Sequence, residues 1–150
     1  MILASVTLTS NRESIVGDAL RSVAGIIDLC LLIDLGITDG TVRVAREIVG
    51  DKVRVVPYVE CDSSRNCGLD KAAAMGADWG MTLDTDERMN FKGADIRGTL
   101  AEIGSGIILV PHDSGTYSKE RFFKLPLVDR FVGHCHECVP PRNAQHVAAA

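Results

Sequence analysis

Two carboxylates one residue apart stand where an apolar run ends. Residues 79–83 are mostly apolar, and Asp84, Asp86 and Glu87 follow them. Side chains of an extended strand alternate between faces, so Asp84 and Asp86 would share one face roughly 7 Å apart. A small hard cation binds oxygen at about 2.0–2.1 Å, so both can bind one ion directly only if the chain bends. We predict that Asp86 binds a divalent cation while Asp84 acts through water or holds another ligand; an acidic turn is the alternative.

Polar residues also stand at the ends of two earlier apolar runs, residues 2–8 and 29–33. They are Thr9, Asn11 and Glu13 after the first run, and Asp34 and Asp39 after the second. Continuous apolar runs of this length are typical of strands buried on both faces of a parallel sheet. Because the carboxyl ends of parallel strands meet at one edge, we expect these side chains and Asp84 and Asp86 to converge on one crevice.

Helix signals separate the apolar runs. The expected helices end at about residue 23, span residues 41–49, and span residues 65–75, with N-caps at Asn11 or Ser10, Asp39 or Thr38, and Ser63 or Ser64. Gly50 and Gly76 end the second and third helices. With a third strand at residues 53–57, this alternation predicts an α/β fold with a mostly parallel central sheet and right-handed crossovers.

The pattern changes after residue 90. A helix is expected at residues 94–103, followed by strands at 107–110, 121–125 and 128–132. Because strand now follows strand, we expect antiparallel additions to the sheet in the C-terminal third. We interpret residues 1–139 as one domain and residues 140–150 as a loosely ordered tail.

Composition narrows the function. The 150 residues are 46% hydrophobic with net charge −4 and contain no basic block, which argues against non-specific nucleic-acid binding. No apolar run approaches the roughly 20 residues of a transmembrane helix, and no basic segment precedes a signal-like run. Five cysteines without a secretory signal lead us to expect reduced thiols in the cytoplasm. Neither a Gly-x-Gly-x-x-Gly nor a Walker loop is present, which disfavours a nicotinamide-type Rossmann site.

Several of these segments together resemble glycosyltransferase family 2, and most closely its bacterial branch that builds lipopolysaccharide core and cell-envelope glycans. The likeness runs over about residues 4–139 and is carried, in order, by residues 9–13, 34–41, 64–66, 78–88, 121–124 and 133–137. The resemblance implies the GT-A fold, a Rossmann-like sandwich. It also implies an inverting enzyme that moves a sugar, of the hexosyl type, from a nucleoside-diphosphate donor to an acceptor hydroxyl. The family favours a UDP-sugar as donor.

The resemblance also implies residue roles. Asp34 would bind the base or ribose, and Thr9, Asn11 and Glu13 would line the same pocket. Arg65 and Asn66 would face the donor. The segment Asp84-Thr85-Asp86 matches the Asp-x-Asp motif that holds Mn²⁺ or Mg²⁺ on the diphosphate, with His136 as a further metal ligand. The alternatives are structural: a helix-start surface arginine at position 65 and a hydrogen-bonded histidine at position 136.

Inversion requires a base on the face of the sugar opposite the leaving group. We predict Glu137 for this role, because a carboxylate suits an oxocarbenium-like centre. Asp113 and Asp129 are rival candidates, and a surface carboxylate is the alternative interpretation of Glu137.

The chain departs from the family in two ways. Ile37 stands where the family usually has Ser. Family members also continue well past this length, and the additional part helps to bind the acceptor. Three alternatives stay open for the acceptor site: it is incomplete, it is absent, or a neighbouring subunit of a homo-oligomer completes it. A catalytically incomplete nucleotide-sugar-binding domain is therefore the second functional hypothesis.

A cluster of cysteine and histidine supports a third hypothesis. The segment from His134 to Cys138 holds a Cys-x-x-Cys pair and two histidines, and Cys61 and Cys67 lie elsewhere. Together these side chains could bind zinc tetrahedrally and make the chain a zinc-stabilised α/β interaction domain. The spacing between Cys61 and Cys67 is wider than in a usual zinc knuckle.

Overall fold

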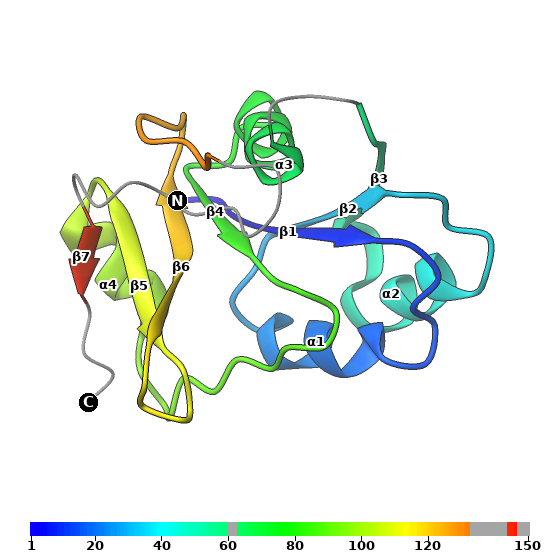
Figure 1. Cartoon of the computed structure of the whole chain (residues 1–150), viewed down its shortest axis with the longest axis horizontal. Helices are drawn as coiled ribbons and strands as arrows, with labels where there is room; N and C mark the ends of the chain where they lie inside the picture. The colour runs from blue at the N-terminus through cyan, green and yellow to red at the C-terminus, as the bar shows by residue number, and fades with distance from the viewer. Residues whose placement is uncertain (60–62, 133–143, 147–150) are drawn as a thin grey trace.

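A mixed β-sheet organises the chain (Figure 1). The computed structural model describes residues 1–59, 63–132 and 144–146, and within them seven strands lie in the order β3-β2-β1-β4-β6-β5-β7. The strands are β1 (Leu3–Thr9), β2 (Leu29–Asp34), β3 (Val53–Pro57), β4 (Trp79–Thr82), β5 (Ile107–Pro111), β6 (Ser118–Lys124) and β7 (Ala144–His146). The helices are α1 (Val16–Val23), α2 (Thr41–Val49), α3 (Ser64–Ala74) and α4 (Ile96–Ile103), with a short 3₁₀ turn, η1 (Gly50–Lys52).

The first half of the sheet is parallel and the second half is mixed. Strand β1 pairs in parallel with β2 and β4, and β2 pairs in parallel with β3. Strand β6 then runs antiparallel to both β4 and β5, and β7 runs parallel to β5. The expectation of a mostly parallel sheet with antiparallel additions in the C-terminal third is therefore confirmed.

Hydrophobic side chains leave the sheet on both faces, as expected for strands covered by helices. On one face Leu3 and Leu32 belong to a core that α1, α2 and α4 cover; on the other, Val6 and Ile33 pack against α3 (Figure 1). Helix α3 approaches the sheet closely at Gly68, where an added Cβ would collide with the Val6 side chain. This two-layer covering leaves the strand ends as the place where polar side chains gather.

Some expected elements differ in the structure. Helix α1 begins at Val16, and neither Asn11 nor Ser10 caps it, because the Asn11 amide is hydrogen-bonded to the 38–39 segment instead. The expected strand at residues 128–132 does not form; only Val132 has a bridge-type backbone pairing. Within the predicted tail, residues 144–146 form strand β7. The other helices begin and end close to the expected positions, with Ser63 as the N-cap of α3.

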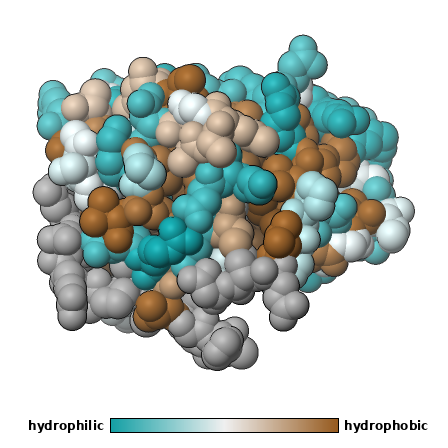
Figure 2. Space-filling view, turned by 90° about the horizontal axis from the view of Figure 1, so that it is seen from above, coloured by the Kyte–Doolittle hydropathy of each residue, from teal (hydrophilic) through white to brown (hydrophobic). Residues whose placement is uncertain are grey.

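The surface seen from the α3 side mixes hydrophilic and hydrophobic side chains (Figure 2). Exposed apolar residues of the described chain include Tyr58, Val59 and Val128. Scattered apolar exposure of this kind is normal for a globular domain. In the described ranges, no helix is both long enough and apolar enough to pass through a bilayer.

Candidate functional site

The carboxyl ends of β2, β1 and β4 lie side by side at one edge of the sheet. Thr9 pairs with Asp34 across β1 and β2, and Val6 pairs with Thr82 across β1 and β4. Beyond this pair the Leu83 N–H donates to the Val6 carbonyl at 3.1 Å, so the chain leaves β4 beside the end of β1. Asp34, at the end of β2, and the Asp-x-Asp segment, after β4, therefore follow strands that both neighbour β1. The structure thus brings Asp34 and the Asp-x-Asp segment to the same edge.

Asp34 closes β2 and holds the loop that follows it. Its Oδ1 accepts hydrogen bonds from the backbone N–H groups of Gly36 (2.8 Å) and Ile37 (2.6 Å). These two bonds, with that from Ile37 the larger influence, lower the pKa of Asp34 below its usual value. Its Oδ2 makes no hydrogen bond with a described residue, so an ionised carboxylate oxygen is available to a ligand.

Asn11 and Glu13 join the loop after β1 to the loop after β2. The Asn11 Oδ1 accepts from the N–H groups of Thr38 (2.7 Å) and Asp39 (3.2 Å), and its amide donates to the Thr38 hydroxyl (2.9 Å). The Glu13 carboxylate accepts from the Gly40 N–H (3.1 Å) and from Arg43 (2.6 Å). Both residues were predicted to bind the donor; in this structure their polar groups hold the two loops together.

Thr9, at the end of β1, and Asp39, after β2, form hydrogen bonds with neighbouring residues of the chain. Thr9 is only 2% exposed, and its hydroxyl donates to the Ser10 carbonyl at 3.1 Å. Asp39 Oδ1 accepts from the Thr41 N–H (2.9 Å) and from its hydroxyl, at the start of α2. Asp39 therefore contacts the first residue of α2, but the N-cap is Gly40 without a side-chain cap hydrogen bond, so the expected cap at Asp39 or Thr38 is not observed.

The Asp-x-Asp segment forms a turn. Strand β4 ends at Thr82, and the Glu87 N–H donates to the Asp84 carbonyl (3.1 Å), which reverses the chain. The chain therefore bends at the two aspartates, as in the alternative of an acidic turn, and the strand ends before Asp84. Within this turn Thr85 is buried, whereas Asp86 is exposed. We call residues 84–87 the acidic turn.

The two aspartates of the acidic turn have different surroundings. Asp84 forms an ion pair with Arg65 (3.1 Å), and the Arg65 guanidinium also lies 5.9 Å from the centre of the Phe131 ring. Asp86 makes no hydrogen bond or ion pair with any described residue. The bend therefore leaves one carboxylate paired with a cation and one free.

Asn66 does not reach this edge. It is fully buried, its Nδ2 donates to the Phe131 carbonyl, and its Oδ1 accepts from the Phe131 N–H, both at 2.9 Å. The Ser63 cap orients the first turn of α3 so that Asn66 faces the core. Its position thus differs from the predicted one facing the donor, and its observed contacts tie α3 to the segment after β6.

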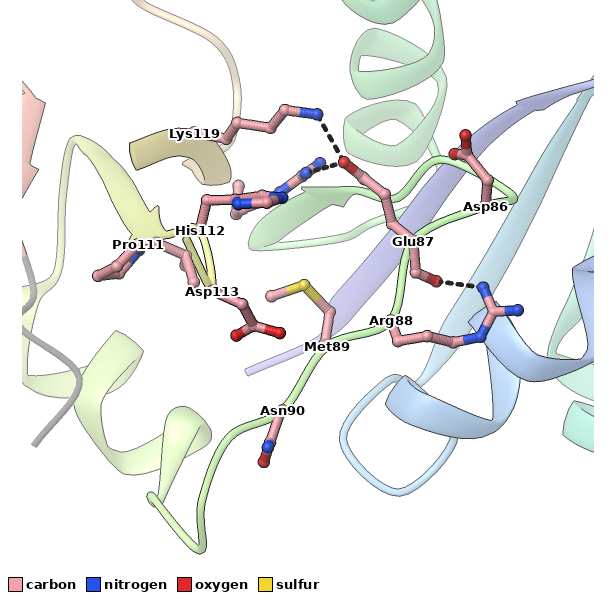
Figure 3. A pocket seen from close by; sticks show the side chains of 11 residues that line it. Asp86, Glu87, Arg88, Met89, Asn90, Pro111, His112, Asp113 and Lys119 are labelled. Carbon is pink, nitrogen blue, oxygen red and sulfur yellow. Dashed lines mark hydrogen bonds and ion pairs between the residues drawn. The ribbon is translucent and has the colours of Figure 1, made fainter. Parts of the chain in front are cut away.

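Sequence reasoning assigned no role to Glu87, yet it anchors the acidic turn (Figure 3). Its Oε1 accepts from Lys119 (2.6 Å) and from Arg121, and its Oε2 accepts from the Asp84 N–H (3.2 Å). Arg121 is only 6% exposed and also donates to the Thr82 carbonyl. Burial raises the pKa of Glu87, but the Lys119 hydrogen bond and the Arg121 charge outweigh it and lower the pKa to about 2. Because a buried arginine on a strand requires an anion, Arg121 was the signal in the sequence that could have revealed Glu87.

A pocket of about 290 Å³ opens beside the acidic turn (Figure 3). It lies between the segment after β4 and the β5–β6 hairpin. Its lining residues are Asp86, Glu87, Arg88, Met89, Asn90, Val110, Pro111, His112, Asp113, Lys119 and Arg121. Asp86 therefore stands at the boundary between this pocket and the edge that carries Asp34.

The described residues do not form a metal site by themselves. No group of three or more His, Cys, Asp or Glu side chains within them is arranged to hold a metal ion. Mg²⁺ is commonly held by one or two carboxylates together with substrate phosphates and water, so a single free Asp86 fits a cation that arrives with a diphosphate. The predicted ligand His136 and the predicted base Glu137 lie outside the described residues.

The cysteines restrict the zinc hypothesis. Cys67 is disulfide-bonded, so it has no thiolate to offer zinc, and the expectation of reduced thiols is wrong for this residue. Cys30 is free and buried, and burial raises its pKa to about 11. Cys61, Cys135 and Cys138, with His134, lie outside the described residues.

Comparison with known proteins yields a structural likeness only. No family model matches the sequence, and no curated protein matches it. Among solved structures, S. aureus TarS 1–349 is 19% identical with a TM-score of 0.60, covering 75% of this chain and 36% of that one. The complex of TarS 1–349 with UDP is 20% identical with a TM-score of 0.58, over the same shares.

A second enzyme shows the same likeness. Glucosyl-3-phosphoglycerate synthase from Mycobacterium tuberculosis, in complex with Mn²⁺, UDP-glucose and phosphoglyceric acid, is 19% identical. Its TM-score is 0.51, and the match covers 71% of this chain and 42% of that one. The chain thus spans less than half the length of these three structures. The shared feature is an α/β fold of the GT-A glycosyltransferase type over about three quarters of the chain.

Proposed function

We propose that this domain binds a nucleoside-diphosphate sugar with a divalent cation and transfers the sugar to an acceptor hydroxyl. One observation carries the proposal: an ionised Asp34 with a free oxygen and an unpaired Asp86 follow the carboxyl ends of β2 and β4, the two strands that flank β1. This arrangement suits a ligand with nucleoside hydroxyl groups at one end and a diphosphate that carries a cation at the other. The fold likeness and the UDP bound by TarS support this assignment.

Each residue at the edge has a distinct part in donor binding. Asp34 Oδ2 accepts hydrogen bonds from the nucleoside, and Asp86 binds Mn²⁺ or Mg²⁺. Arg65, held by Asp84, contributes positive charge next to the diphosphate. When bound there, such a cation would supply positive charge to neutralise the negative charge that develops on the leaving diphosphate. A UDP-sugar remains the favoured donor because of the family resemblance.

The proposed reaction is a displacement with inversion. The acceptor hydroxyl oxygen bonds to the anomeric carbon while the bond from that carbon to the diphosphate oxygen breaks. The nucleoside diphosphate leaves with the electron pair, and the hydroxyl proton passes to a carboxylate. Glu137 remains the predicted base and His136 a predicted metal ligand. Among the rivals, Asp113 lines the pocket beside Asp86.

Calorimetry tests donor binding. UDP and GDP are titrated into the protein with MnCl₂, with MgCl₂ and with EDTA. We expect binding that requires the metal and that weakens at least about 100-fold in Asp86→Ala, because even residues outside the metal's direct ligands cost 10–100-fold. Asp51→Ala is the control, since Asp51 is also exposed but precedes β3 and so lies at the opposite sheet edge. Absence of nucleotide binding in every metal would overturn the proposal.

Measurement of turnover distinguishes a transferase from a nucleotide-sugar-binding domain without catalysis. Release of UDP from UDP-sugars is followed with wild type and with Glu137→Gln. Turnover lost in the variant while UDP binding persists supports catalysis. Binding without any turnover would instead identify a catalytically incomplete nucleotide-sugar-binding domain.

A further inference from the structure

The pocket beside the acidic turn lies on the side of β4 away from Asp34. In the strand order, β2 and β1 flank β4 on one side, and β6 and β5 flank it on the other. The pocket walls come from the chain after β4, from the end of β5 and from β6. A donor that spans Asp34 and Asp86 therefore ends at the mouth of this pocket.

The charges of the pocket balance. Three carboxylates, Asp86, Glu87 and Asp113, face three cations, Arg88, Lys119 and Arg121. The cations already have partners: Lys119 and Arg121 bond Glu87, and Arg88 bonds Asp18 at 3.1 Å. The pocket therefore offers no surplus positive charge to attract an anion.

The groups left for a ligand are two carboxylate acceptors and one amide donor. Neither Asp86 nor Asp113 bonds a described residue through its side chain, and Figure 3 shows them on opposite sides of Glu87. Asn90 uses its Oδ1 to accept from the Lys92 N–H (3.1 Å), which leaves its amide N–H groups for a ligand. Carboxylates that accept from hydroxyls form strong, charge-assisted bonds. This combination suits a ligand with several hydroxyl groups.

Size and apolar contacts narrow the ligand further. The volume of about 290 Å³ is at the lower limit of small-molecule pockets, which suits one sugar ring rather than an oligosaccharide. Met89, Val110 and Pro111 supply an apolar surface against which the C–H face of a ring can pack. A lipid chain would instead require a wall that is mostly apolar.

We propose that this pocket binds the acceptor as a single neutral sugar or polyol unit whose hydroxyl groups donate to Asp113 and to Asp86. The inference rests on the proposed function, because the acceptor is meaningful only beside a donor. It assigns Asp113 as an acceptor-binding residue. It also implies that a free phosphate does not compete for the site.

Protein NMR on the full chain tests the pocket and the donor site separately. UDP with MgCl₂ is added first, then glucose, galactose, N-acetylglucosamine and glycerol in turn, then inorganic phosphate. We expect UDP with Mg²⁺ to shift the backbone amides of Gly36 and Ile37, and at least one hydroxyl compound to shift those of Asn90 and Asp113. Asp113→Asn should weaken that second binding about ten-fold, because the hydroxyl then donates to a neutral amide oxygen and the charge-assisted bond is lost. Asp51→Asn, at the opposite edge, should leave it unchanged.

Every outcome decides. If UDP binds but no hydroxyl compound shifts the pocket amides, the acceptor assignment is wrong and the proposed function stands. If phosphate displaces the sugar from the pocket, the assignment of a neutral ligand is wrong. If neither UDP nor a sugar binds, the proposed function and the acceptor assignment are both wrong. If a sugar binds but UDP does not, the pocket is a sugar site and the proposed transferase function is wrong. A well-dispersed spectrum of Asp113→Asn shows that the variant is folded.

Discussion

The two parts of the candidate site, one after β1 and β2 and one after β4, are stabilised in different ways. We call them the β2 half and the β4 half. In the β2 half, the loops at residues 10–13 and 36–41 are joined by side chain to backbone hydrogen bonds, such as those from Thr38 and Asp39 to Asn11. In the β4 half, the acidic turn is held by ion pairs that reach across the sheet, from Arg121 and Lys119 on β6 to Glu87.

Because of this difference, the two halves should respond differently to salt and pH. Hydrogen bonds to backbone groups fix loop shape and depend little on salt, and those of the neutral Asn11 amide do not depend on pH. Ion pairs depend on ionisation, and leaving one partner of a buried pair alone is costly. The contacts of Asn11 are therefore expected to be insensitive to salt and pH, and the acidic turn to respond to both.

Removal of the Glu87 charge should give the largest loss of stability. Glu87→Gln leaves Arg121, which is 6% exposed, without its anion. Breaking a buried pair in this way typically costs 3–5 kcal/mol, so we expect the free energy of unfolding to fall by about 3 kcal/mol, measured by urea denaturation. Glu47→Gln is the matched control, because Glu47 pairs with Arg43 on the surface and should show no measurable change. Equal effects of the two variants would contradict the contrast.

Acid should weaken the same turn. Folding lowers the pKa of Glu87 from 4.5 to about 2, so its stabilising effect is complete above pH 4.5 and is lost as the pH falls from there toward 2. The network is partly open to solvent, which screens it, so we expect about 2 kcal/mol rather than the full value. Urea denaturation at several pH values measures this loss. Glu87→Gln should flatten the profile in this window, and an unchanged profile would contradict the assignment.

The two halves also differ in how well they could be predicted from the sequence. Local patterns placed the parallel strands, helices α2 and α3, and the acids at the strand ends. Asp34 was found because it directly closes an apolar run, and Asp39 because it precedes a helix by two residues. These positions depend only on residues that are close in the sequence, so the spacing of residue types was enough to predict them.

Relations between distant residues could not be predicted in the same way. Glu87 and Arg121 are 34 positions apart and meet only because β6 pairs with β4. Asn66 resembled a donor-facing residue by its place in a motif, but its burial depends on the backbone of Phe131, 65 positions later. Asn11 resembled a helix cap, yet the loop after β2 takes its amide. In each case a tertiary partner competed with the local interpretation.

A smaller loss of stability is expected when the hydrogen bonds of Asn11 in the β2 half are removed. Asn11→Ala removes three hydrogen bonds to the 38–39 segment, all on the exposed surface. We expect the free energy of unfolding to fall by about 1 kcal/mol, and UDP binding to weaken because the loop beside Asp34 loses its support. Asn11→Asp is the matched variant, since it retains both acceptor bonds and loses only the donor to Thr38, and it should lie between wild type and Asn11→Ala. A pH-dependent effect of Asn11→Ala would show that this half also relies on charge.

The smallest effect is expected for the surface arginine of the β2 half. Arg43 bonds both Glu13 and Glu47 at 2.6 Å, but all three side chains are about half exposed. Exposed ion pairs contribute little and are screened by salt, whereas the Glu13 bond to the Gly40 N–H survives the loss of Arg43. Arg43→Ala should therefore leave the urea midpoint unchanged within error at both low and high salt. A loss that disappears at high salt would show that charge, rather than backbone hydrogen bonding, positions the loop after β2.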